Sequence, residues 1–110
     1  MKQIVTRVLG VGNRNADGSS RQKILEKYAK RGQPVVLRRV ASAQGDQNKI
    51  EVLLHDEEHD RHYRVGFLPG RVGGMLAKHL DASAEVTAVI ASLTTNEEST
   101  HTGVNLKITY

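Results

Sequence analysis

The stretch that most constrains the fold is residues 63–80, YRVGFLPGRVGGMLAKHL, where one hydrophobic period gives way to another. Its first part alternates with the period of a half-buried strand, with Tyr63, Val65 and Phe67 predicted on one face. Pro69-Gly70 then interrupts the run, because proline has no N–H for a ladder. Beyond it, apolar residues recur at the spacing of one helical face, at Val72, Met75, Leu76 and Leu80. The stretch therefore predicts a strand over 61–68, a turn, and a helix over 70–80.

The same two periods describe the rest of the chain. Alternating or β-branched runs predict further strands over residues 3–12, 35–40, 50–54, 85–93 and 104–110. A second helix is predicted over 21–31, with Ser19 or Ser20 as its N-cap and Gly32 closing it. Short joins favour hairpins, and two helices are too few for a doubly wound parallel sheet. We predict one mainly β (α+β) domain over 1–110, a six-stranded antiparallel barrel with two short helices.

The charge of the chain is unevenly distributed. Residues 1–40 carry ten Lys or Arg and two acids, a net charge of +8. Residues 41–110 carry six Lys or Arg and ten acids, a net charge of −4, which gives the total of +4. A basic N-terminal part favours a polyanion as partner, although basic residues on a helix can also be only its solvated face.

Composition excludes several other classes of function. The chain has no Cys, hence no disulfide, thiolate zinc site or cysteine nucleophile, which fits a cytoplasmic location. No stretch resembles a signal peptide or a membrane anchor, so no membrane association is expected. There is no GxSxG elbow and no P-loop, so we predict no enzyme activity and no cofactor.

The histidine-rich segment 55–62 raises the question of a metal site. A hairpin there could bring two imidazoles and a carboxylate together, from His55, His59 and His62 and their acidic neighbours. Their spacing matches no helix-based pair of the HExxH kind. The segment is therefore predicted to be an exposed, charged hairpin connection, and no metal ligands are assigned.

Nucleic-acid binding has more support from the residues. Cations lie on or beside predicted strands, where a rigid backbone can aim them at phosphates, at Arg38, Arg39, Arg61, Arg64 and Arg71. Platforms for stacking are few, because the chain has one Phe, three Tyr and no Trp. Tyr28, on its predicted helix, is expected to be a core residue.

Three segments in order resemble a HIRAN domain, a small module found alone in bacteria and at the N-terminus of helicase-like DNA-repair ATPases. They are residues 8–11 with 20–25, residues 45–52, and residues 65–69 with the following helix. The resemblance covers nearly the whole chain and implies an OB-like barrel. It also implies capture of a single-stranded DNA 3′ end in repair or replication, with a helicase or other repair protein as partner. ATPase activity would belong to helicase domains attached in longer relatives.

The resemblance assigns binding roles only where a residue of this sequence matches a binding residue of the family. Asp46 matches an acidic residue that holds the terminal sugar hydroxyl, although an Asx turn with Asn48 explains it equally well. Gly45 stands in place of an aromatic residue, and Gly12-Asn13 in place of a basic and an aromatic one, with Arg14 a step later. Gly70 replaces a lysine, with Arg71 adjacent. Phe67 matches a position that contacts the ligand in the family, but it can equally be a residue of the hydrophobic core.

The predicted nucleic-acid site therefore comprises Asn13, Arg14, Arg38, Arg39, Asp46, Arg64, Phe67 and Arg71. Asp46, Phe67 and Arg71 are expected to line one mouth of the barrel and to receive a strand end. Arg38 and Arg39 are expected to contribute jointly to the salt dependence of binding. The alternative from a different class is a protein-interaction or self-associating module that keeps the barrel without the end pocket.

Overall fold

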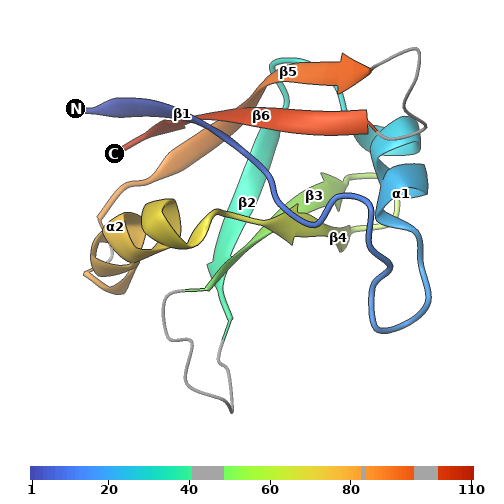
Figure 1. Ribbon diagram of the computed structural model, residues 1–110, viewed down its shortest axis with the longest axis horizontal. Helices are drawn as coiled ribbons and strands as arrows, with labels where there is room; N and C mark the ends of the chain where they lie inside the picture. Colours follow the sequence, from blue (N-terminus) through green and yellow to red (C-terminus); the bar gives the residue numbers. More distant parts are fainter. Residues whose placement is uncertain (41–48, 83, 96–101) are drawn as a thin grey trace.

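The computed structural model describes residues 1–40, 49–82, 84–95 and 102–110 (Figure 1). Its elements are β1 (Gln3–Arg7), α1 (Arg21–Tyr28), β2 (Pro34–Arg39), β3 (Ile50–Asp56), β4 (Arg61–Phe67), α2 (Gly70–Asp81), β5 (Thr87–Thr95) and β6 (Thr102–Thr109). The six strands form one antiparallel sheet in the order β1-β6-β5-β2-β3-β4. The mainly β class and the order of elements are as the sequence predicted.

Several element boundaries differ from the prediction for local reasons. β1 ends at Arg7 rather than near residue 12, and Gly10 turns the chain with a φ of +77°. α1 begins after Ser20, whose hydroxyl accepts from the Lys23 amide, and it ends at Tyr28, three residues before the predicted end. β3 continues through Asp56, so His55 lies in a strand rather than in a connection.

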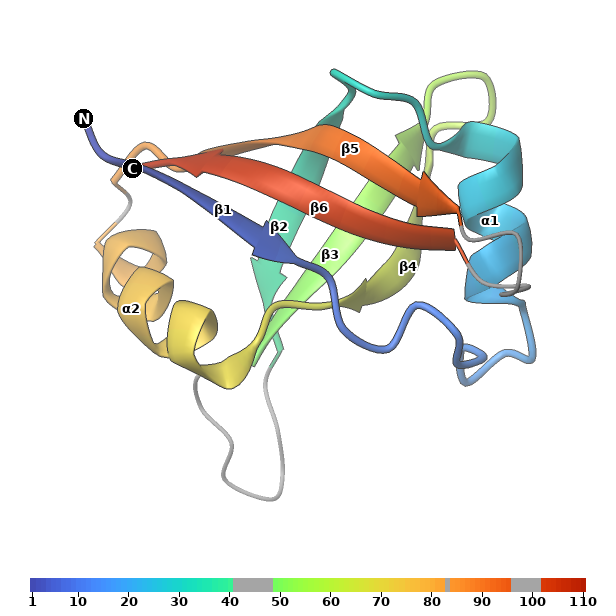
Figure 2. The ribbon, with the colours of Figure 1, turned by 45° about the horizontal axis from the view of Figure 1, so that its top comes forward.

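The sheet folds over on itself at β2 (Figures 1 and 2). One part contains β1, β6 and β5, and the other contains β3 and β4; β2 pairs with β5 only through Pro34 and Val35. The two edges, β1 and β4, do not form a continuous ladder, so the predicted closed barrel is not confirmed. An isolated bridge joins the edges instead, with hydrogen bonds of 2.8 and 2.9 Å between the backbones of Leu9 and Phe67.

The core lies between the two parts of the sheet and is aliphatic. Its fully buried members come from both helices and from β3, β4, β5 and β6, and they include Leu25, Ile50, Leu54, Val65, Leu76, Ile90, Leu106 and Ile108. The predicted face of α2 is only partly buried, because Met75 is 37% exposed. Tyr28 packs against the core, as expected, and its ring stacks on Tyr63 at 5.2 Å between centroids.

A bulge in β4 changes which side chains share a face. Val52 pairs with Gly66, but Leu53 pairs with Arg64, so Val65 is an extra residue in the ladder. Val65 is buried, whereas Phe67 is only half-buried and lies outside the core cluster. The prediction that Tyr63, Val65 and Phe67 share one face was wrong, because the bulge shifts the alternation by one residue.

Candidate functional site

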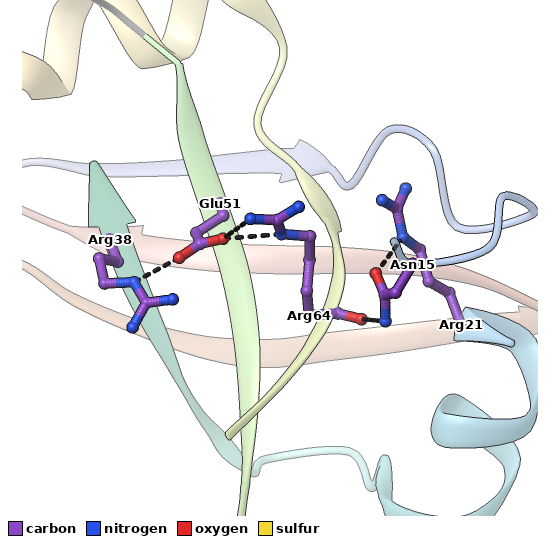
Figure 3. A network of polar contacts seen from close by, with 5 residues as sticks. All are labelled: Asn15, Arg21, Arg38, Glu51 and Arg64. Atoms are coloured by element: carbon purple, nitrogen blue, oxygen red, sulfur yellow. Dashed lines mark hydrogen bonds and ion pairs between the residues drawn. The ribbon is translucent and has the colours of Figure 1, made fainter. Parts of the chain in front are cut away.

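The outer face of β2, β3 and β4 carries a row of charged side chains (Figure 3). Arg38 and Glu51 are direct cross-strand partners, and Glu51 is also paired in register with Phe67. The β4 bulge places Arg64 beside the same glutamate. Three adjacent strands therefore contribute to a single polar surface.

Glu51 is the centre of this surface and is almost inaccessible, with its side chain 2% exposed. Its Oε1 accepts from Arg38 Nε, and its Oε2 accepts from Arg64 Nε at 2.7 Å. A buried carboxylate requires such partners, because an unpaired buried charge is strongly unfavourable. The Arg38 side chain is 62% exposed and that of Arg64 is 33% exposed, so both arginines remain available to solvent on their outer sides.

A second set of contacts fixes the loop before α1 against β4. Asn15 donates to the Arg64 carbonyl oxygen at 3.0 Å and accepts from Arg21 Nε at 2.8 Å (Figure 3). Arg21 also donates to the Gly10 carbonyl oxygen at 2.8 Å. Burial and, second, the nearby charge of Arg64 lower the pKa of Arg21. The loop thus holds a buried cation next to the row of charges.

Phe67 is surrounded by positive charge. The Lys49 ammonium lies 4.1 Å from the centroid of its ring, and the guanidinium carbons of Arg64 and Arg21 lie at 5.1 and 5.3 Å. The backbone of Phe67 is held by the bridge to Leu9. The ring is therefore an aromatic platform on a rigid strand, with three cations around it.

A cavity of about 280 Å³ opens beside Glu51 and Arg64. Its lining includes Asn15, Asp17, Ser19, Arg38, Glu51, Tyr63 and Arg64. The Asp17 carboxylate accepts from the hydroxyl and the backbone amide of Ser19, and these two bonds lower its pKa. Both carboxylates of the cavity thus have partners, and its two arginines balance their charge.

The structure brings together only some of the residues predicted for the site. Arg38, Arg64 and Phe67 share the outer face of the sheet. Arg39 instead forms an ion pair with Asp81 at the end of α2, because adjacent residues of a strand point to opposite faces. Asp46 and Gly45 lie outside the described residues.

The remaining predicted residues occupy other surroundings. Arg71 lines a cavity of about 370 Å³ with residues of β1 and α2, including Val5 and Met75. Asn13 is exposed and closes a turn through its amide and the Gly10 carbonyl oxygen, and Arg14 donates to the Gly18 carbonyl oxygen at 2.9 Å. Arg38 pairs with Glu51 and Arg39 pairs with Asp81, on opposite faces of β2, so their geometry does not support the predicted joint contribution to one surface.

Four residues of the site were missed by sequence reasoning: Asn15, Arg21, Lys49 and Glu51. Glu51 was the one detectable from sequence, as an acid within the strand run KIEVLL that needs a cationic partner once buried. The contacts of Arg21 and Asn15 depend on how the loop crosses β4, which no local pattern encodes.

The histidine-rich hairpin has two separate arrangements. The rings of His55 and His62 stack across the strands at 4.6 Å between centroids, and His55 Nε2 lies 2.9 Å from an Asp60 oxygen. Ligand atoms of Asp56, Glu58 and His59 lie within 4.8 Å of one another. The Asp56 carboxylate already bonds within this turn, where it accepts from the Glu58 backbone amide and contacts His59 Nδ1 at 2.8 Å.

The fold of the chain is similar to the folds of two solved structures. The HIRAN domain of human HLTF has a TM-score of 0.63 to this chain at 18% identity, covering 97% of this chain and 73% of that one. A protein from Lactobacillus plantarum has a TM-score of 0.61 at 15% identity, covering 99% and 98%. The resemblance suggested by the sequence is confirmed at the level of fold.

Comparison of the sequence itself adds no closer relationship. No family model matches the chain, and no curated protein matches it. In the described ranges, no helix combines the length and the apolar character needed to cross a membrane.

Proposed function

We propose that this chain is a nucleic-acid-binding module that binds single-stranded DNA on the outer face of β2, β3 and β4. The observation that carries the proposal is Phe67, a half-exposed ring on a strand with three cations within 5.3 Å of its centroid. A base can stack on such a ring while Lys49 and Arg64, the two accessible cations, neutralise its phosphates. Only an unpaired base offers its face, which favours single strands over duplexes.

The charges around the platform support the same function. Arg38 and Arg64 each use Nε on Glu51, and this contact fixes the direction of each guanidinium. Their exposed sides can then contact phosphate oxygens without further ordering of long side chains. The HIRAN-type fold is consistent with this use of the surface, since the resemblance noted from the sequence implies DNA capture.

A fluorescence anisotropy titration with a labelled oligothymidylate tests the proposal. Phe67→Leu removes the ring but keeps an apolar side chain, and we expect it to weaken binding by about 1–3 kcal/mol. Arg39→Gln is the matched control, because Arg39 pairs with Asp81 away from this surface. Equal binding by the wild type and Phe67→Leu, or equal affinity for a duplex of the same sequence, would contradict the proposal.

Recognition of a 3′ end is the finer form of this function and follows only from the HIRAN resemblance. Strands ending in a 3′ hydroxyl and a 3′ phosphate should differ in affinity if the end is captured, and Asp46→Ala should remove the difference. Equal binding of both strands would restrict the function to internal contacts. A repair context with a helicase partner rests on the same resemblance and is tested by co-purification from cells treated with a replication inhibitor.

Self-association is a second candidate function, and one exposed edge favours it. Among the described strands β1 is an edge strand that pairs with β6, and its Val5 is 69% exposed and lines a cavity with Met75. Light scattering over a concentration series would reveal a dimer, and Val5→Lys should abolish it. A monomer at every concentration would eliminate this candidate.

A further inference from the structure

A second cavity, of about 380 Å³, lies where the loop before α1, the helix itself and β4 meet. Its lining includes Arg14, Ser19, Ser20, Lys23, Lys27, Tyr28 and Tyr63. We call it the tyrosine groove. It shares Ser19 and Tyr63 with the cavity beside Glu51, so the two cavities are contiguous across this part of the surface.

The tyrosine groove has the chemistry of a polyanion site. Within the described ranges, none of its three cations (Arg14, Lys23 and Lys27) has a carboxylate at ion-pair distance, and its lining contains no acid. Tyr28 and Tyr63 stack with their planes 16° apart, and the Lys27 ammonium lies 5.2 Å from the Tyr28 centroid. Cations without partners beside aromatic faces are the combination that single-stranded nucleic acid uses.

We propose that the strand bound at Phe67 continues across the cavity beside Glu51 into the tyrosine groove, where Lys23 and Lys27 contact its phosphates. This inference rests on the proposed function and specifies its substrate as a chain of several nucleotides. Phe67 and Tyr63 pair with Glu51 and Leu54, which are three residues apart on β3, so they lie roughly 10 Å apart along the strand. A ligand that reaches both must be a polymer rather than a free nucleotide.

The path between the two regions presents little repulsion to phosphate. Its two carboxylates, Asp17 and Glu51, both accept hydrogen bonds from neighbouring groups. Arg64 lies between Phe67 and Tyr63 on β4, so a backbone crossing this surface passes a cation on the way to the lysines of the groove. An acidic peptide would also satisfy the lysines, but it would make no use of the stacked tyrosines.

Length dependence of binding tests the inference with the full chain. Anisotropy is measured for labelled oligothymidylates of about three and about fifteen nucleotides, which bracket the usual site sizes. The test variant is Lys23→Gln with Lys27→Gln. The control is Lys30→Gln with Arg31→Gln, which removes the same charge from exposed positions outside both cavities.

We expect the test variant to lose about tenfold in affinity for the longer strand, with a salt slope lower by about 1.4, and to bind the short strand normally. The control should bind both strands like the wild type. Equal loss in the test and control variants, or equal loss for both lengths, would overturn the inference. Equal competition by polyglutamate would overturn it as well.

The experiment separates the two proposals. If Phe67→Leu weakens the short strand while the lysine variant leaves the longer one unchanged, the proposed function stands and the extended path is wrong. If the wild type binds neither strand, both proposals fail.

Discussion

Glu51 is a buried acid that holds two arginines from neighbouring strands. We expect Glu51→Gln to lower the free energy of unfolding by about 1–3 kcal/mol, because the amide keeps the volume but leaves Arg38 and Arg64 with no counter-charge. Urea denaturation measures the change. Glu57→Gln, at an exposed position of the same hairpin, should change stability little. A loss as large at Glu57 would show that overall charge, rather than this network, is responsible.

Asp56 should make stability depend on pH in the acid range. Burial acts to raise its pKa, but bonds from the side chain and backbone of His59 outweigh this and hold the pKa below 3.8. A carboxyl with a depressed pKa stabilises the fold above its unfolded pKa, and the contribution disappears as pH falls through the folded value. Asp56→Asn should therefore be less stable than the wild type at neutral pH, and the difference should shrink as the pH falls through the acid range. A constant difference across this range, measured by thermal unfolding, would contradict the assignment.

The β4 bulge and its glycine set the arrangement of whole elements. A Cβ on Gly66 would lie closer than 3.0 Å to the Leu9 carbonyl oxygen, so only glycine permits the bridge between the sheet edges. We expect Gly66→Ala to cost about 1–3 kcal/mol. Gly70→Ala is the matched control, since nothing lies within 4 Å of its added Cβ at the start of α2. Chemical denaturation of both variants checks the prediction. Equal stability of the two variants would show that the Leu9–Phe67 bridge can shift to accept the added methyl group at little cost.

The elements were predictable from sequence, but the faces of β4 were not. Alternation and the change of period at Pro69-Gly70 located β4 and α2 to within a residue or so. A periodic pattern assumes unbroken alternation, however, and one extra residue at Val65 moved Phe67 from the face that it was predicted to share with Tyr63 and Val65 to the outer face of the sheet. The bulge depends on the partner strand and the crossing loop, which are distant in sequence.

At the scale of the whole molecule, the excess of N-terminal charge does not form one surface. Arg38 belongs to the row of charges on β2 to β4, Arg39 pairs with α2, and Arg21 is buried under the loop. Lys23 and Lys27 line the tyrosine groove. The net charge predicted the class of partner that we propose, but the strand alternation and the loop path decide which cations can act together.

The strand order has a consequence for synthesis. Of the six described strands, β1 is synthesised before the others, yet the strand that it pairs with, β6, is synthesised after the others. The N-terminal strand therefore has to wait, unpaired, until nearly all of the described chain has emerged. Nascent chains arrested at increasing lengths should stay protease-sensitive throughout and become resistant in one step when β6 is released. Gradual protection of β1 in shorter chains would mean that another segment holds it during translation.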